Sequence, residues 1–168
     1  MSALAVTSDF LETGAGRREF LRETSHELIR EIGGGAYGKV WLARSVTGTY
    51  RAIKVVFRSD FKSDTPYDRE YRGIQKFEPI SRDHDGFIDI LHVGRNDQTG
   101  YFYYVMELGD DAKDEPGQPL NLETYAPRTL DSERRRCRVT PCPRLSARST
   151  AAAAAVRHAQ WRRLPTRQ

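Results

Sequence analysis

The chain has 168 residues, 38% of them apolar and 30% charged, and this size allows one ordinary domain. It contains no run of 18 apolar residues, so we expect no membrane segment. A net charge of +4 would by itself favour nucleic-acid binding, but the charge is divided unevenly. Residues 1–133 carry 17 Lys and Arg against all 23 Asp and Glu, a charge of −6, whereas residues 134–168 carry ten Arg and no acidic residue, a charge of +10.

Both cysteines, Cys137 and Cys142, lie in the basic part, which excludes a disulfide framework for the acidic part. The N-terminus does not have the pattern of a signal peptide, because the apolar stretch Met1–Val6 is short and is soon followed by Asp9 and Glu12. We therefore predict a cytoplasmic protein.

The first predicted element is a loose arm over residues 1–25, with at most a short helical turn at residues 19–24. Residues of high β-propensity then dominate three segments, which are predicted strands: Leu28–Ile32, Lys39–Arg44 and Tyr50–Phe57. Val46–Thr49 has the length and the glycine of a hairpin loop, so the second and third strands should be antiparallel neighbours.

One amphipathic helix is predicted from Pro66 to Pro79, because apolar residues recur there at spacings of three and four: Tyr67, Tyr71, Ile74 and Phe77. Phe87–Val93 and Tyr101–Leu108 follow as two further strands joined by a turn-rich loop. The predicted fold is α+β, with a five-stranded, mainly antiparallel sheet and one packed helix.

The C-terminal region divides at Glu133. Asp110–Pro119 is acidic and rich in Gly and Pro, which predicts an exposed loop, and residues 112–133 are predicted to be a linker. Residues 134–168 are rich in Arg and Ala and have few large apolar side chains, too few to build a core. We expect this tail to be disordered or partly helical and not a domain of its own.

The segment Gly33-Gly34-Gly35-Ala36-Tyr37-Gly38 matches the pattern G-x-G-x-x-G. Glycines allow backbone amides to approach phosphate oxygens, but a plain tight turn would have the same sequence. A dinucleotide-binding fingerprint should open a helix, whereas a strand pattern follows here. A P-loop needs a Ser or Thr where Val40 stands. The remaining interpretation of the glycine run is a loop that joins two antiparallel strands.

Lys54 lies within the apolar strand segment Ala52–Val56. It is either buried with a charged partner or turned outward by strand alternation, and the strand alone does not decide between them. The helix offers a partner, Glu70, which lies between Tyr67 and Tyr71 on the apolar face, while Asp68 is expected to point away from it.

The glycine run, the Ala52-Ile53-Lys54 segment and a glutamate on the single helix together resemble the N-terminal lobe of a protein kinase of the bacterial Ser/Thr type. The resemblance covers roughly Leu28–Asp111, within a predicted lobe of residues 26–111. It implies binding of ATP and, in the parent family, transfer of its γ-phosphoryl group to a protein Ser or Thr hydroxyl with Mg²⁺.

The same resemblance implies roles for individual residues. The backbone of residues 33–38 would cover the ATP phosphates, Lys54 would hold the α- and β-phosphates, and Glu70 would orient Lys54. The adenine would be enclosed by Ile32, Val40 and Ala52. Met106 would be the gatekeeper, and Glu107 and Gly109 would supply the hinge groups that read the adenine edge.

The catalytic motifs of the family, His-Arg-Asp with its Asn and Asp-Phe-Gly, do not occur in the chain. Ser81-Arg82-Asp83 and Asp60-Phe61-Lys62 are near matches, but both precede the fourth predicted strand, and we interpret them as loop residues. The Mg²⁺ ligands are therefore missing. We expect a chain that has lost phosphotransfer and that binds ATP weakly or not at all, because the second lobe has no counterpart.

Thr129–Glu133 resembles the start of the second lobe, and every acidic residue disappears after it. Our hypothesis is a frameshift near Glu133, which the other reading frames of the coding DNA would test. Two alternatives treat the tail as functional: binding of nucleic acid by its arginines, or a basic helix at Ala151–Leu164 on an anionic membrane. A further alternative is a non-catalytic, pseudokinase-like interaction module. Cys137, Cys142 and His158 do not form a zinc pattern, so no metal is predicted.

Overall fold

The computed structural model describes residues 8–35, 37–83, 87–113 and 120–128 of the chain. The first elements are a 3₁₀ helix, an α-helix and two strands: η1 (Ser8–Glu12), α1 (Gly14–Thr24), β1 (His26–Gly34) and β2 (Lys39–Ser45). They are followed by β3 (Tyr50–Phe57), η2 (Arg58–Asp60), α2 (Asp64–Arg82), β4 (Ile90–Asn96) and β5 (Tyr101–Met106).

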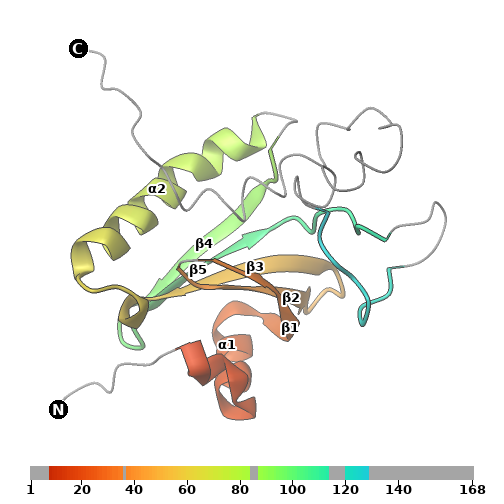
Figure 1. Ribbon diagram of the computed structural model, residues 1–168, viewed down its shortest axis with the longest axis horizontal. Coiled ribbons are helices and arrows are strands. Elements are labelled where there is room, and N and C mark those ends of the chain that lie inside the picture. Colours follow the sequence, from red (N-terminus) through yellow and green to blue (C-terminus); the bar gives the residue numbers. More distant parts are fainter. Residues whose placement is uncertain (1–7, 36, 84–86, 114–119, 129–168) are drawn as a thin grey trace.

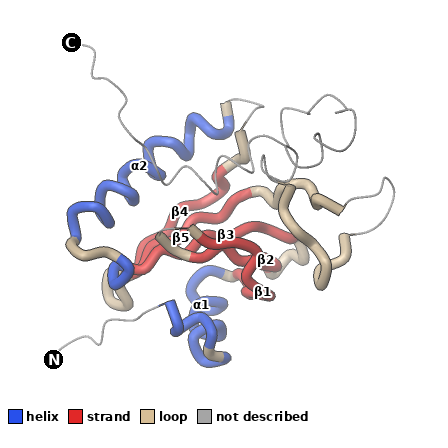
Figure 2. Tube along the Cα trace, in the orientation of Figure 1, coloured by secondary structure: helices blue, strands red, loops and turns tan. Residues whose placement is uncertain are grey.

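The five strands form one sheet in the order β1-β2-β3-β5-β4, and every neighbouring pair is antiparallel. The two α-helices lie on opposite faces of this sheet, as Figures 1 and 2 show. The predicted α+β class and the five-stranded antiparallel sheet are thus confirmed. The prediction of a single helix is wrong, because the described residues contain two.

Each face of the sheet has its own apolar core. The core on the α1 side contains Phe20 together with the strand residues Trp41, Ile53, Val55 and Tyr103. The core on the α2 side is built around Tyr67 of α2 and also holds strand residues, namely Val40, Ala52, Val56, Phe102, Tyr104 and Met106. Because both faces are covered, β3 is buried from Ala52 to Phe57 without alternation.

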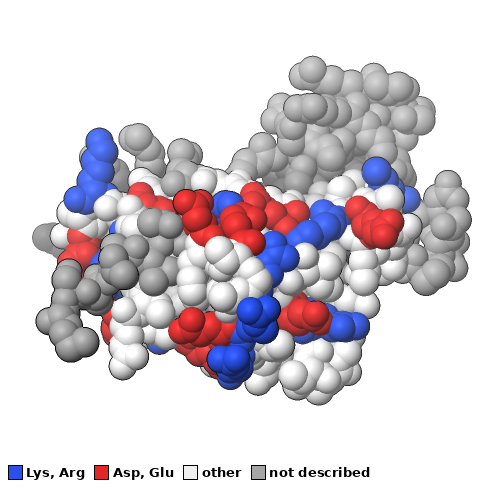
Figure 3. All heavy atoms as spheres, turned by 90° about the horizontal axis from the view of Figure 1, so that it is seen from below, with Lys and Arg blue, Asp and Glu red and all other residues white. Residues whose placement is uncertain are grey.

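The N-terminal arm differs from expectation, because residues 8–24 form η1 and α1. Thr13 caps α1 by accepting a hydrogen bond from the N–H of Gly16, and Ser25 ends it in a left-handed conformation. Leu11 and Phe20 are 1% and 0% exposed. The sequence pattern missed the helix since few apolar residues anchor it. Figure 3 shows this side of the molecule, where acidic and basic side chains are interspersed.

Two element boundaries also differ. Pro79 lies inside α2, which continues to Arg82 and is therefore not closed by the proline. The last turn is held by Ser81, which is 0% exposed and whose hydroxyl donates to the carbonyl oxygen of Glu78 and accepts the N–H of Ile90. Ser81 and Arg82 are thus helical and not loop residues. The fourth strand begins at Ile90 rather than at residue 87.

Candidate functional site

The glycine run closes the turn between β1 and β2. The N–H of Gly35 donates to the carbonyl oxygen of Gly38 over 3.3 Å, and Gly38 has a φ of +84°. A Cβ at Gly38 would lie 2.3 Å from the carbonyl oxygen of Val55, whereas a Cβ at Gly33 would meet nothing within 4 Å. Gly38 is therefore required by close packing of the turn against β3. Ala36 lies outside the described residues.

Tyr37 connects this turn to the segment between β3 and α2. Its ring stacks on Phe61 with a centroid separation of 4.4 Å and an interplanar angle of 9°. Phe61 in turn packs edge-on against Tyr67, a fully buried residue of α2, with a ring-centroid separation of 5.7 Å. The sequence treated Phe61 only as part of a near match to a motif, and the structure gives it a packing role beside the glycine turn.

Lys54 lies in the middle of β3, paired with Val40 on β2 and Tyr104 on β5. It is 3% exposed, and its ammonium group lies 5.8 Å from the ring centroid of Tyr104. The outward-facing alternative for Lys54 is therefore excluded. Because desolvation disfavours the charged form, burial lowers the pKa of Lys54, and the nearby Glu70 opposes this shift only in part.

Glu70 lies half-buried on α2 and is electrostatically coupled to Lys54. Burial raises the pKa of Glu70, and the Lys54 charge partly counters that rise. No nitrogen–oxygen contact within 4.0 Å joins the two side chains, which are both among the described residues. Lys54 and Glu70 thus lie on facing elements as predicted, but their side chains do not form the predicted ion pair within 4.0 Å. Desolvation is the largest influence on each group, because mutual attraction falls with separation.

The predicted adenine-enclosing residues Ile32, Val40 and Ala52 and the predicted gatekeeper Met106 belong to the core on the α2 side. Val40, Ala52 and Met106 are buried in it, and Ile32 packs against it half-buried. Ala52 and Met106 are paired directly across β3 and β5.

The predicted hinge follows β5 directly. Glu107 is exposed and donates its N–H to the carbonyl oxygen of Asp89 over 3.1 Å. The carbonyl oxygen of Gly109 accepts a hydrogen bond from the hydroxyl of Tyr125 over 3.0 Å. The chain after β5 is therefore anchored on both sides, by Asp89 and by Tyr125.

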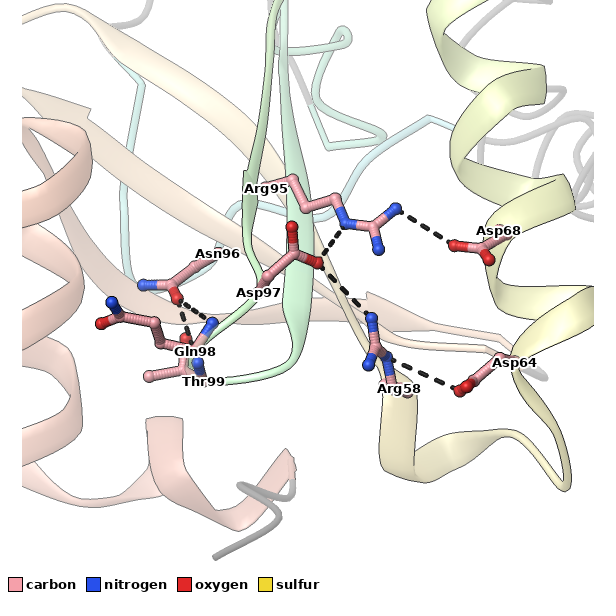
Figure 4. Close-up of polar contacts among 8 residues, drawn as sticks. All are labelled: Arg58, Asp64, Asp68, Arg95, Asn96, Asp97, Gln98 and Thr99. Atoms are coloured by element: carbon pink, nitrogen blue, oxygen red, sulfur yellow. Dashed lines mark hydrogen bonds and ion pairs between the residues drawn. The ribbon is translucent and has the colours of Figure 1, made fainter. Parts of the chain in front are cut away.

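A charged network holds the N-terminal half of α2 against the turn between β4 and β5 (Figure 4). Arg95 on β4 bonds Asp68 on α2 at 3.1 Å and Asp97 in the turn at 2.6 Å. Arg58 pairs with Asp97 at 3.4 Å and with Asp64 at 3.7 Å. The expectation that Asp68 points away from the packed face is therefore wrong, because β4 supplies a cation that the sequence did not reveal.

The same two arginines lie over aromatic rings of α2. The Arg95 guanidinium is 5.4 Å from the ring centroid of Tyr67 and 5.1 Å from that of Tyr71, and Arg58 is 5.2 Å from Tyr67. Burial raises the pKa of Tyr67 to about 12, and both arginines counter the rise. Cation–π and ionic contacts thus act together on the helix that carries Glu70.

Comparison of the sequence with models of known protein families gave no match. Within the described residues, no group of three or more His, Cys, Asp or Glu side chains is placed to hold a metal ion. None of the helices in that part of the chain has the length and apolar character needed to cross a bilayer. Three predictions concern residues outside the described part of the chain. They are the basic tail at residues 134–168, the start of a second lobe at Thr129–Glu133, and the absence of a zinc site at Cys137, Cys142 and His158.

Proposed function

We propose that this chain is the ATP-binding lobe of a protein serine/threonine kinase, and that the chain itself does not transfer phosphate. The observation that carries the proposal is Lys54, a lysine that is 3% exposed and has no carboxylate within 4.0 Å among the described residues. A buried cation without a close counter-ion costs free energy, and such groups cluster at functional sites. An anionic ligand would offset that cost.

The surroundings of Lys54 suit a nucleotide with its phosphates. The turn that contains Gly35 and Gly38 lies at one end of β2, beside β3, and glycines carry no Cβ that would block a phosphate oxygen from the backbone. At the other end of the same face, Ala52 and Met106 form an apolar pair suited to an adenine ring. Lys54 would hold the phosphates and Glu70 would orient it.

The strand order and the position of α2 between β3 and β4 agree with the resemblance that the motifs suggest. The chain carries no His-Arg-Asp or Asp-Phe-Gly motif to bind Mg²⁺ or to orient a hydroxyl nucleophile. Its own residues therefore supply nucleotide binding and not the chemical step. Affinity should be weak, since the ligand in this family lies between two lobes.

The proposal is tested by titrating the ¹⁵N-labelled full chain with ATP while amide resonances are recorded. We expect weak, saturable shifts at the glycine turn, around Lys54 and at residues 107–109, and we expect Lys54→Met to abolish them. Lys76→Met, on the exposed surface of α2, is the matched control and should leave them unchanged. Absence of saturable shifts in the wild type, or equal shifts in Lys54→Met, would refute the proposal.

A further inference from the structure

The segment after the predicted hinge folds back on itself. Residues 110–112 and 126–128 run antiparallel: the N–H of Ala112 donates to the carbonyl oxygen of Ala126 over 2.7 Å, and Asp111 forms a bridge with Pro127. The carboxylate of Asp111 also accepts the N–H of Ala126 over 3.1 Å. Within the predicted linker, residues 126–128 are therefore hydrogen-bonded to residues 110–112, and Tyr125 beside them is buried.

Arg30 on β1 holds that segment from the other side. Its Nε donates to the carbonyl oxygen of Leu122 over 2.8 Å, and its Nη2 donates to the carbonyl oxygen of Tyr125. Hydrogen bonds from a charged donor are stronger than neutral ones. Because β1 leads directly into the glycine turn, Arg30 joins residues 120–128 to the strand that begins the proposed phosphate site.

Tyr125 is the residue at which the two attachments meet. Its main-chain oxygen accepts from Arg30, while its hydroxyl donates to the carbonyl oxygen of Gly109 over 3.0 Å. The side chain is 2% exposed, and burial raises the pKa of its hydroxyl, which stays a neutral donor. One buried residue thus spans from β1 to the end of the predicted hinge.

We propose that Tyr125 is a positioning residue that fixes the hinge at Gly109 relative to β1, and so makes the site select adenine nucleotides over guanine nucleotides. This inference rests on the proposed function, because only a nucleotide site gives the hinge a base to read. Adenine and guanine differ in the donors and acceptors of the edge that the hinge would meet. Discrimination between them therefore requires main-chain groups that are held in place.

Two measurements on the full chain test the inference, with Tyr125→Phe as the variant that removes only the hydroxyl. The first is amide hydrogen exchange of residues 107–111 without nucleotide. Loss of one net hydrogen bond should accelerate exchange there about fivefold. Tyr103→Phe is the matched control, because its hydroxyl lies 3.4 Å from His92 Nε2 and its ring packs in the core on the α1 side.

The second measurement compares binding of ATP, GTP and inorganic tripolyphosphate by amide shifts. We expect Tyr125→Phe to reduce the preference for ATP over GTP about fivefold and to leave tripolyphosphate binding unchanged, because the hydroxyl acts on the base end of the site. Tyr103→Phe should retain the wild-type preference.

Faster hinge exchange together with a reduced ATP preference supports the inference. Unchanged amide exchange at residues 107–111 overturns the inference, whatever the preference for ATP over GTP is. Faster exchange with an unaltered preference also overturns it and leaves Tyr125 a purely structural residue. If the wild type binds ATP no better than GTP, adenine selection is refuted. If the wild type binds neither nucleotide, the proposed function fails as well.

Discussion

Replacing Lys54 with methionine should make the protein more stable at pH 7, although it removes the residue on which nucleotide binding is proposed to depend. Lys54 is 3% exposed, so its ammonium group is almost fully desolvated in the folded protein. Methionine keeps an unbranched stem of similar length and places no charge in the core on the α2 side.

The magnitude follows from two opposing contributions. Burying one ion costs several kcal/mol in real proteins. Two unit charges 4 Å apart attract by about 4 kcal/mol at an effective dielectric constant of about 20. Lys54 and Glu70 are farther apart than 4.0 Å, so their attraction is weaker than this. The lowered pKa of Lys54 has the same sign, with desolvation as its largest cause. Because desolvation outweighs the attraction to Glu70, we expect a gain of about 1–3 kcal/mol in the free energy of unfolding, each unit by which a pKa is lowered being worth about 1.4 kcal/mol.

The gain should depend on pH in a defined direction. The folded-state pKa of Lys54 lies below its ordinary value of 10.5. Between these two values the unfolded chain binds a proton that the folded protein has lost, so the stability of the wild type rises with pH. The advantage of Lys54→Met is therefore complete below the folded-state pKa and shrinks as the pH rises toward 10.5.

Urea denaturation followed by far-ultraviolet circular dichroism, at pH 7 and at pH 10, measures both effects. Lys76→Met provides the control for a lysine on the exposed surface and should change stability by less than about 0.5 kcal/mol. If Lys54→Met lowers stability at pH 7 by more than about 1 kcal/mol, the ammonium group is favourably paired. The inference that an anionic ligand offsets the cost of burying the Lys54 charge would then be wrong.

Three further substitutions test the packing around the site, each by urea denaturation. Gly38→Ala should cost at least about 2 kcal/mol, because of the φ of +84° and the Cβ placed 2.3 Å from a carbonyl oxygen, whereas Gly33→Ala has open space and should cost less than about 1 kcal/mol. Phe20→Ala should cost about 3–5 kcal/mol if α1 belongs to the core, and a cost below about 1 kcal/mol would contradict its burial. Arg95→Met should cost about 1–2 kcal/mol through its lost ionic and cation–π contacts and accelerate amide exchange in the first turns of α2; unchanged exchange there would contradict the anchoring.

Local sequence signals predicted the strands and the main helix well, because hairpin loops and helical periodicity act within a few residues. The burial of Lys54 could not be decided in the same way. Its orientation depends on whether one or both faces of the sheet are covered. Apart from Lys54 itself, every residue of Ala52–Phe57 is apolar, and this was a signal that both faces are buried, since strands with one solvated face alternate. The same signal required a second layer, and α1 provides it.

Hydrogen bonds between residues far apart in the sequence were not predictable. Arg95 meets Asp68 27 residues away, and Arg30 meets Tyr125 95 residues away. Nothing in the local pattern around either arginine identifies its partner, because each contact depends on how complete elements pack. The sequence could therefore name Lys54 and Glu70 as a pair but not the distance between them.

The contacts between α2 and β4 also determine how Lys54 and Glu70 can approach each other. Arg95 holds the first half of α2 to β4 through Asp68, and Ser81 holds its last turn to the start of β4 through Ile90. A helix fixed at both ends to the same strand cannot swing toward β3 without breaking one of these contacts. Rotation of the two long side chains requires no such loss. The gap between the ammonium and carboxylate groups should thus close by side-chain rotation when an anion enters, with α2 remaining in place.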